Sequence, residues 1–171
     1  MSRSPERVVC VEGHRAVPAI HEILNEGGEV ELRVSGSSMS PVLKDGRDGV
    51  LLTAPGKTFR RYDILFFQRE DGSYVLHRMV GRDRGGRLIM NGDAQSWTER
   101  IEPSQVIAVV RSIRRKGRWM ECSRERCRLF AAAWARTRPF RPLIFRAWGM
   151  IASGVRRLSG RSRQGGGDEM R

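Results

Sequence analysis

The stretch that decides the fold is Val-Ser-Gly-Ser-Ser-Met-Ser-Pro, residues 34–41. It ends a run that alternates like a strand, and a turn-rich segment, Asp-Gly-Arg-Asp-Gly, follows at residues 45–49. The glycine before the two serines lets another backbone approach closely, and Pro41 restricts the direction in which the chain leaves. A serine at the end of a strand, with a nearby backbone N–H, has what a nucleophile requires. We therefore take Ser38 as a candidate nucleophile; the alternative is an ordinary serine-glycine turn.

The chain around this stretch is strand-like from residue 29 to residue 113. The candidate strands cover residues 29–35, 49–53, 62–67, 73–82, 86–91 and 105–113. Gly, Asp and Pro turns separate them, and no helical pattern lies between them. One short helix precedes them at residues 16–26, where apolar residues recur at three- and four-residue spacing. This order predicts a mainly β fold, an all-β sheet or small barrel, rather than a doubly wound one.

The charge of the chain is confined to one end. The 171 residues carry a net charge of +13. Residues 1–110 contain 15 Lys/Arg and 15 Asp/Glu, whereas residues 111–171 contain 17 and 4. The sequence therefore indicates a neutral domain with a basic extension, and such an extension is expected to meet an anionic partner.

The basic extension contains two predicted helices, at residues 123–137 and 142–158. In the second, apolar residues including Leu143, Trp148 and Ile151 share one side of a helical wheel, and arginines occupy the other. This composition is typical of a helix that lies in a membrane interface, so we expect residues 123–158 to contact an anionic membrane surface. Two alternatives stay open: the helices pack on the β domain, or they bind nucleic acid, which the strongly apolar face makes less favoured. Residues 160–171 are predicted to be disordered.

A serine nucleophile needs a base, and His77 is the best-placed histidine. It lies in the predicted strand 73–82, whereas the other two histidines precede the β region. A histidine can act as general base at its ordinary pKa; the alternative is a structural histidine. Asp93, after a glycine and just beyond a strand, is the candidate to orient the imidazole, or else a turn residue that caps its own loop. The oxyanion would meet the backbone N–H of Ser38 and a second donor near Gly36 or Ser37.

No cofactor or metal site is expected from the sequence. The three cysteines lack partners at zinc-ligand spacing and do not form a disulfide framework. The polar N-terminus is followed by too short an apolar run for a signal peptide, and no run of about 20 apolar residues predicts a membrane span. We therefore expect a cytoplasmic protein that associates peripherally with the membrane.

Four boxes together resemble the signal peptidase I and SOS-repressor protease superfamily. They are residues 34–46, with Ser-Met-Ser-Pro, residues 61–66, residues 77–81, with His-Arg-Met-Val-Gly, and residues 91–95, with Asn-Gly-Asp-Ala-Gln. Their order and approximate spacing match the nucleophile, paired-strand, base and Gly-Asp boxes of that family. Bacterial signal peptidases usually carry lysine at the position of His77, so this chain resembles the branch that uses a Ser–His pair.

The resemblance implies a β-rich peptidase domain over residues 29–113, preceded by an N-terminal segment at 1–28 and followed by the extension at 114–159 and the tail at 160–171. It implies a serine endopeptidase with Ser38 as nucleophile, acting on a signal or leader peptide with small side chains beside the cut bond. Two other hypotheses remain: an idle peptidase-like module that binds a peptide or membrane, and a nucleic-acid-associated regulator.

Overall fold

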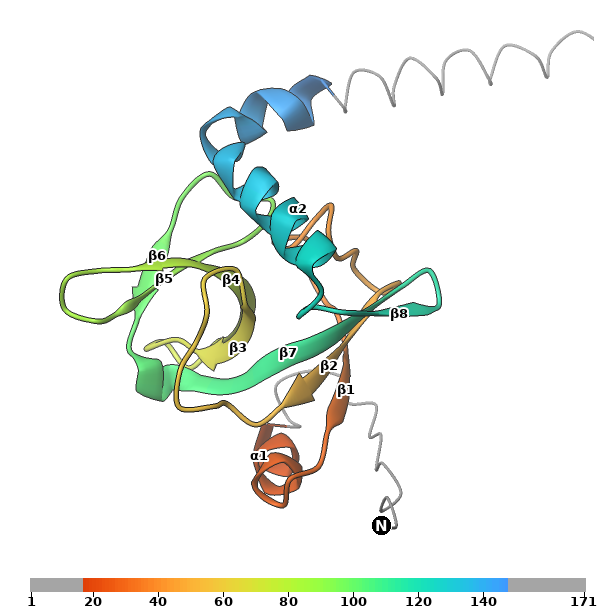
Figure 1. The fold of residues 1–171 in the computed structure, drawn as a ribbon, viewed down its shortest axis with the longest axis vertical. Helices are drawn as coiled ribbons and strands as arrows, with labels where there is room; N and C mark the ends of the chain where they lie inside the picture. The colour runs from red at the N-terminus through yellow and green to blue at the C-terminus, as the bar shows by residue number, and fades with distance from the viewer. Residues whose placement is uncertain (1–16, 148–171) are drawn as a thin grey trace, which may run out of the picture. The chain divides into compact units, whose positions relative to one another are not determined.

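The computed structural model describes residues 17–147, and one antiparallel sheet dominates them (Figure 1). The strands are β1 (Val30–Arg33), β2 (Gly49–Thr53), β3 (Ile64–Gln68), β4 (Tyr74–Arg82), β5 (Leu88–Asn91), β6 (Glu99–Ile101), β7 (Val106–Arg115) and β8 (Arg118–Glu121). Their order is β1-β2-β7-β3-β4-β5-β6, with β8 paired to β7. The mainly β fold predicted from the sequence is confirmed. Two of the strands, β6 and β8, were not among those expected.

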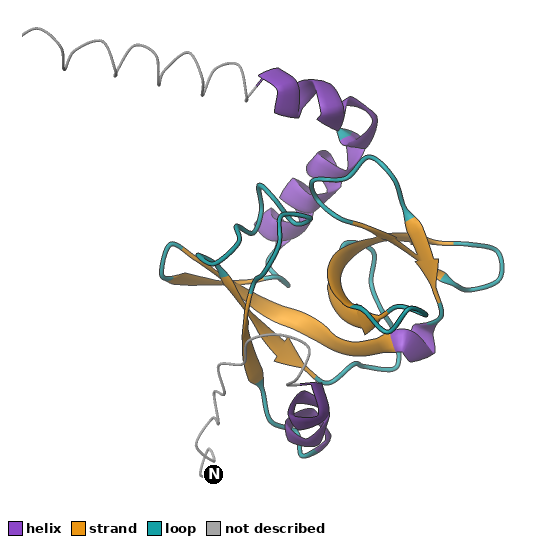
Figure 2. Cartoon of the chain, turned by 180° about the vertical axis from the view of Figure 1, so that it is seen from behind, coloured by secondary structure: helices purple, strands orange, loops and turns teal. Residues whose placement is uncertain are grey.

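Helices flank the sheet at both ends of the described chain. Helix α1 (Val17–Asn25) precedes the strands, and α2 (Glu125–Arg136) follows them. Among the described residues there are two short 3-10 helices: η2 (Pro103–Gln105), between β6 and β7, and η3 (Arg138–Phe140), after α2. Residues 141–147 are also helical. Figure 2, from the opposite side, shows α1 and α2 on separate ends of the strands. The expected helices at 16–26 and 123–137 are therefore present, whereas most of the one expected at 142–158 and the tail at 160–171 lie outside the described residues.

The chain divides into two compact units, Met1–Arg138 and Pro139–Arg171. The first unit includes β7, β8 and α2, so the boundary expected between residues 113 and 114 falls inside β7.

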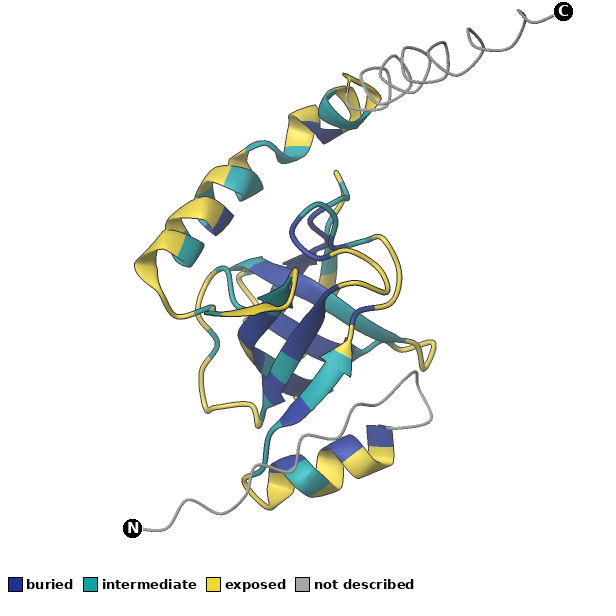
Figure 3. Cartoon of the chain, turned by 90° about the vertical axis from the view of Figure 1, so that its right-hand side faces the viewer, coloured by how far each residue is buried: buried dark blue, intermediate teal, exposed yellow. Residues whose placement is uncertain are grey.

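The long strand β7 and the neighbouring β3 separate two apolar clusters. Alternate side chains of a strand point to opposite faces. Ile64 and Phe66 join the cluster that contains α1, β1 and β2, whereas Leu65 and Phe67 join the one formed with β4, β5 and β6. The run Ile-Leu-Phe-Phe is apolar throughout because both faces of β3 are buried, as the dark strands in Figure 3 show. The curled sheet thereby positions the end of β1 near the middle of β4.

Candidate functional site

The loop that carries Ser38 is held by contacts on both sides of the serine. Gly36 has a φ of 87°, a left-handed conformation that favours glycine, and its N–H donates to Asp45 Oδ1 at 3.0 Å. Met39 is only 1% exposed and anchors the loop in the core. Ser38 itself is half-buried between these two fixed points. The loop therefore turns at Gly36, presents the hydroxyl of Ser38 and returns to the core at Met39.

Ser38 and His77 line the same cavity, which has a volume of about 200 Å³. His77 is the fourth residue of β4 and lies opposite Leu65 of β3 in the sheet register. The next residue, Arg78, lines a different cavity, since neighbouring side chains of a strand face opposite ways. The fold therefore brings the expected serine and histidine to one side of β4.

A carboxylate holds the imidazole of His77 from behind. His77 Nδ1 lies 2.7 Å from Glu99 Oε1, and the His77 side chain is 1% exposed. The rings of Phe67 and Trp97 approach the imidazole edge-on, with centroids at 6.1 and 6.4 Å. These contacts restrict both the tilt and the rotation of the ring.

Arg69 fixes Glu99 in turn and keeps it ionised. Its Nε and Nη2 donate to Glu99 Oε2 and Oε1 at 2.6 and 2.9 Å. Burial acts to raise the pKa of Glu99, but the hydrogen bond from Arg69 and the charges of His77 and Arg69 outweigh it and hold that pKa below its usual value. Because an ionised carboxylate only accepts hydrogen bonds, the proton between the two groups belongs to His77 Nδ1.

The second ring nitrogen of His77 is therefore the basic one. Burial lowers the pKa of His77 below its ordinary value, and the Glu99 carboxylate offsets this only in part. The ring is thus neutral near pH 7, with its proton on Nδ1 and a free electron pair on Nε2. A neutral imidazole in a cavity shared with a serine can accept the hydroxyl proton.

Asp93 has a different partner from the one expected. Its Oδ1 and Oδ2 accept from Arg78 Nε and Nη2 at 3.0 and 2.7 Å, and both side chains are buried. Glu99 takes the place beside the imidazole that the sequence suggested for Asp93, which corrects that assignment. The physical reason is the direction of the side chains of β4, since Asp93 lies on the side of Arg78 and Glu99 on the side of His77. The only sequence signal for Glu99 was its position in the short strand-like run Thr-Glu-Arg-Ile, and that signal is weak.

The backbone around Asp93 supports the serine loop from below. The N–H of Ala94 donates to the carbonyl of Ser38 at 2.7 Å. A side chain at Gly92 would place its Cβ 2.8 Å from that same carbonyl, so only glycine fits without displacement. Trp134 of α2 donates through Nε1 to the carbonyl of Asp93 at 2.9 Å. The segment around Asp93 is thus a structural support of the loop that carries Ser38.

The backbone N–H groups near the serine leave room for an oxyanion. The Gly36 N–H is taken by Asp45, so it is excluded as a donor. Among residues 17–147, the N–H groups of Ser37 and Ser38 have no hydrogen-bond partner. Ser38 lines the serine cavity and Ser37 precedes it in the chain, so these two neighbouring donors can stabilise a negative charge that develops at Ser38.

No family model, no curated protein and no solved structure matches this chain. In the described part, residues 17–147, no three His, Cys, Asp or Glu side chains gather as metal ligands would. None of the helices within that same part is both long and apolar enough to cross a bilayer.

Proposed function

We propose that the protein is a serine endopeptidase in which Ser38 is the nucleophile, His77 the general base and Glu99 the residue that positions the base. The observation that carries the proposal is the shared cavity of Ser38 and His77, together with the Glu99 carboxylate that holds His77 Nδ1. This is the order of groups that activates a serine hydroxyl.

In the proposed reaction, Ser38 Oγ attacks the peptide carbonyl while His77 Nε2 takes the hydroxyl proton. The oxyanion accepts hydrogen bonds from the Ser37 and Ser38 backbone, and Glu99 stabilises the imidazolium. His77 then returns the proton to the leaving amine, and the acyl-enzyme is hydrolysed by a water that His77 deprotonates in the same way.

The surface beside the serine suits an extended peptide as substrate. Strand β1 lies at one end of the strand order, and extended peptides commonly bind beside the end strand of a sheet. A groove of about 600 Å³ runs beside this edge, and its walls include Leu32, Val34, Phe66 and Tyr74. A peptide laid along it would bring its backbone to the serine loop, because Val34 and Ser35 line both this groove and the serine cavity. The family resemblance adds small side chains beside the cut bond and a role in leader or signal peptide processing.

A serine-directed alkyl phosphonate tests the proposal directly. We expect the intact protein to be labelled once per chain, labelling to vanish in Ser38→Ala and to fall at least 100-fold in His77→Ala, by the scale of losses in Ser–His enzymes. The matched control is Ser37→Ala, which removes the exposed neighbouring hydroxyl and is expected to keep the labelling. Undiminished labelling of Ser38→Ala, or no labelling of the intact protein, would favour the idle peptide-binding module.

We also propose that α2 contacts an anionic membrane through its outer face. Leu129 of α2 is 70% exposed, and arginines flank it along the helix. The inner face packs on the sheet through buried Ala131 and through Trp134, so Trp134 is turned away from the outer face. The rest of the expected lipid-binding face, residues 148–158, lies outside the described residues.

Flotation with phosphatidylglycerol vesicles checks the membrane proposal. We expect the full chain to float with these vesicles, to stay behind with neutral phosphatidylcholine, and to lose at least half of its bound fraction in Leu129→Ser. Equal flotation of the variant, or failure to float combined with tight, salt-sensitive duplex DNA binding, would favour the nucleic-acid alternative.

A further inference from the structure

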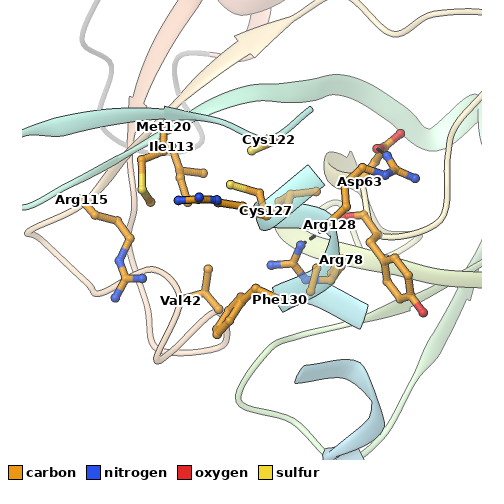
Figure 4. Close-up of a pocket in the computed structure, with 14 residues that line it drawn as sticks. Val42, Asp63, Arg78, Ile113, Arg115, Met120, Cys122, Cys127, Arg128 and Phe130 are labelled. Carbon is orange, nitrogen blue, oxygen red and sulfur yellow. Dashed lines mark hydrogen bonds and ion pairs between the residues drawn. The ribbon is translucent and has the colours of Figure 1, made fainter. Parts of the chain in front are cut away.

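A second cavity lies under α2, on the face of β4 opposite the serine. Its volume is about 220 Å³ (Figure 4). The apolar part of its wall consists of Val42, Ile64, Ile113, Met120, Phe130 and Ala131. In Figure 4 the sulfur atoms of Met120, Cys122 and Cys127 lie along one side, and Val42 and the Phe130 ring along the other. Burial raises the pKa of the Cys122 thiol to about 12, so the thiol on this wall is uncharged at neutral pH.

The charged part of the wall is strongly cationic. Four arginines and one carboxylate, Asp63, line the cavity. Arg78 is neutralised by Asp93 from behind, and Arg128 lies 3.8 Å from Asp63. Within residues 17–147, Arg115 donates to the neutral carbonyl of Pro41, at 3.3 Å, and pairs with no carboxylate.

The fourth arginine, Arg126, is exposed and has no carboxylate partner among residues 17–147. Two guanidinium groups beside an apolar cavity are therefore left without a counter-ion inside the described structure. An empty apolar cavity does not hold water well, and unpaired cations at its wall favour an anion.

We propose that this cavity binds a single-chain anionic amphiphile, a fatty acid carboxylate, with the alkyl chain inside and the carboxylate between Arg115 and Arg126. The size selects one chain, since a cavity of about 150 Å³ accommodates one benzene-sized molecule. The chain would replace contacts missing between α2 and the sheet, and the two arginines would supply charge-assisted hydrogen bonds to the head. This proposal does not depend on the serine chemistry, because the cavity lies on the other face of β4.

Titration calorimetry of the full chain with decanoate, 1-decanol and decylammonium, each below its micelle concentration, tests the proposal. We expect saturable binding of one decanoate per chain, at least tenfold tighter than that of the alcohol, with no saturable binding of the ammonium. Arg115→Gln and Arg126→Gln should each weaken decanoate binding about tenfold. The matched control, Arg84→Gln, changes an exposed arginine in the β4–β5 turn that does not line the cavity, and should bind as the parent does.

Ala131→Leu fills the cavity from the α2 side and should abolish binding. Thermal unfolding shows whether that variant is folded, and the arginine variants keep the test decisive if it is not. Equal binding of decanoate and decanol, binding of decylammonium, or an effect of Arg84→Gln as large as that of Arg126→Gln would overturn the proposal. Phosphonate labelling of Ser38 is measured separately. A failed ligand experiment therefore leaves the peptidase proposal standing, and failed labelling leaves the fatty acid proposal standing.

Discussion

Replacing Glu99 by glutamine isolates the contribution of one charge to the proposed site. The oxygen that Glu99 offers to His77 is Oε1, which also accepts from Arg69 Nη2. A glutamine oxygen is therefore best placed at the Oε1 position, where it keeps both of these bonds. The glutamine NH₂ then faces Arg69 Nε, which is also a donor. Glu99→Gln thus keeps the proton on His77 Nδ1 but removes the negative charge. It also brings two hydrogen-bond donors, the glutamine NH₂ and Arg69 Nε, face to face.

The size of the effect follows from the bond that is weakened. The imidazolium formed during attack loses its counter-ion at 2.7 Å. A hydrogen bond to a charged group contributes about 1.5–3 kcal/mol, which corresponds to roughly a 10- to 200-fold loss of rate. We expect the plateau rate of phosphonate labelling to fall by that factor, while the thermal midpoint changes little because the side-chain shape is kept.

The pH dependence of the labelling rate shows in which direction the Glu99 charge shifts the pKa of His77. Labelling requires neutral His77, so its rate rises with pH through the pKa of that group. The Glu99 charge raises the pKa of His77, and the Arg69 charge lowers it. Removing Glu99 alone therefore lowers this pKa further, and the rising limb of the profile moves toward acid pH. Removing Arg69 as well, in Arg69→Gln/Glu99→Gln, takes away the opposing charge and should move the limb part of the way back.

Stopped-flow or discontinuous labelling between pH 4 and pH 9 is the assay. If Glu99 had a purely structural role, Glu99→Gln would lower the amplitude of labelling without moving the rising limb of the pH profile toward acid pH. An unchanged plateau rate in Glu99→Gln, or a limb displaced toward alkaline pH, would refute the assignment of His77 as a base held by Glu99.

Three further predictions concern the support of the serine loop. Asp93→Asn removes one partner of the buried pair with Arg78, and we expect urea unfolding to show a loss of about 3–5 kcal/mol together with slower labelling. Gly92→Ala forces a Cβ to within 2.8 Å of the Ser38 carbonyl, so labelling should slow at least tenfold while the sheet still folds. The hydrogen bond from Arg47 lowers the pKa of Asp48 from 3.8 to about 2, so its contribution to stability is present above pH 4 and lost as the pH falls toward 2; urea midpoints across that range measure it.

Each of these predictions has a matched comparison. Asp83→Asn changes a carboxylate that pairs with the exposed Arg87 and should cost less than 1 kcal/mol, so an equal loss in both aspartate variants would contradict the buried-pair argument. Gly56→Ala adds a Cβ 3.9 Å from its nearest neighbour and should label normally. Asp48→Asn should flatten the dependence of the urea midpoint on acid pH; if the dependence persists unchanged, Asp48 is not its source.

The strands and the first helix could be predicted because their signals are local. Alternation in β4, the continuous apolar run of β3 and the three- to four-residue spacing in α1 each follow from backbone geometry within one element. The strands β6 and β8 are three and four residues long, and each carries two charged residues, so no apolar alternation marks them as strands. They form because β5 and β7 offer them a hydrogen-bonding edge.

The sequence by itself identified as candidates a serine in a glycine-containing loop, one histidine in the β region and the carboxylate of Asp93, and it did not single out Glu99. Only the tertiary structure decided which carboxylate lies against His77 and which lies against Arg78. Asp93 and Glu99 are six positions apart on the same loop-and-strand segment, and nothing in their immediate neighbours distinguishes them. The curl of the sheet does so, because His77 and Arg78 face opposite sides of one strand, with Glu99 against His77 on one side and Asp93 against Arg78 on the other.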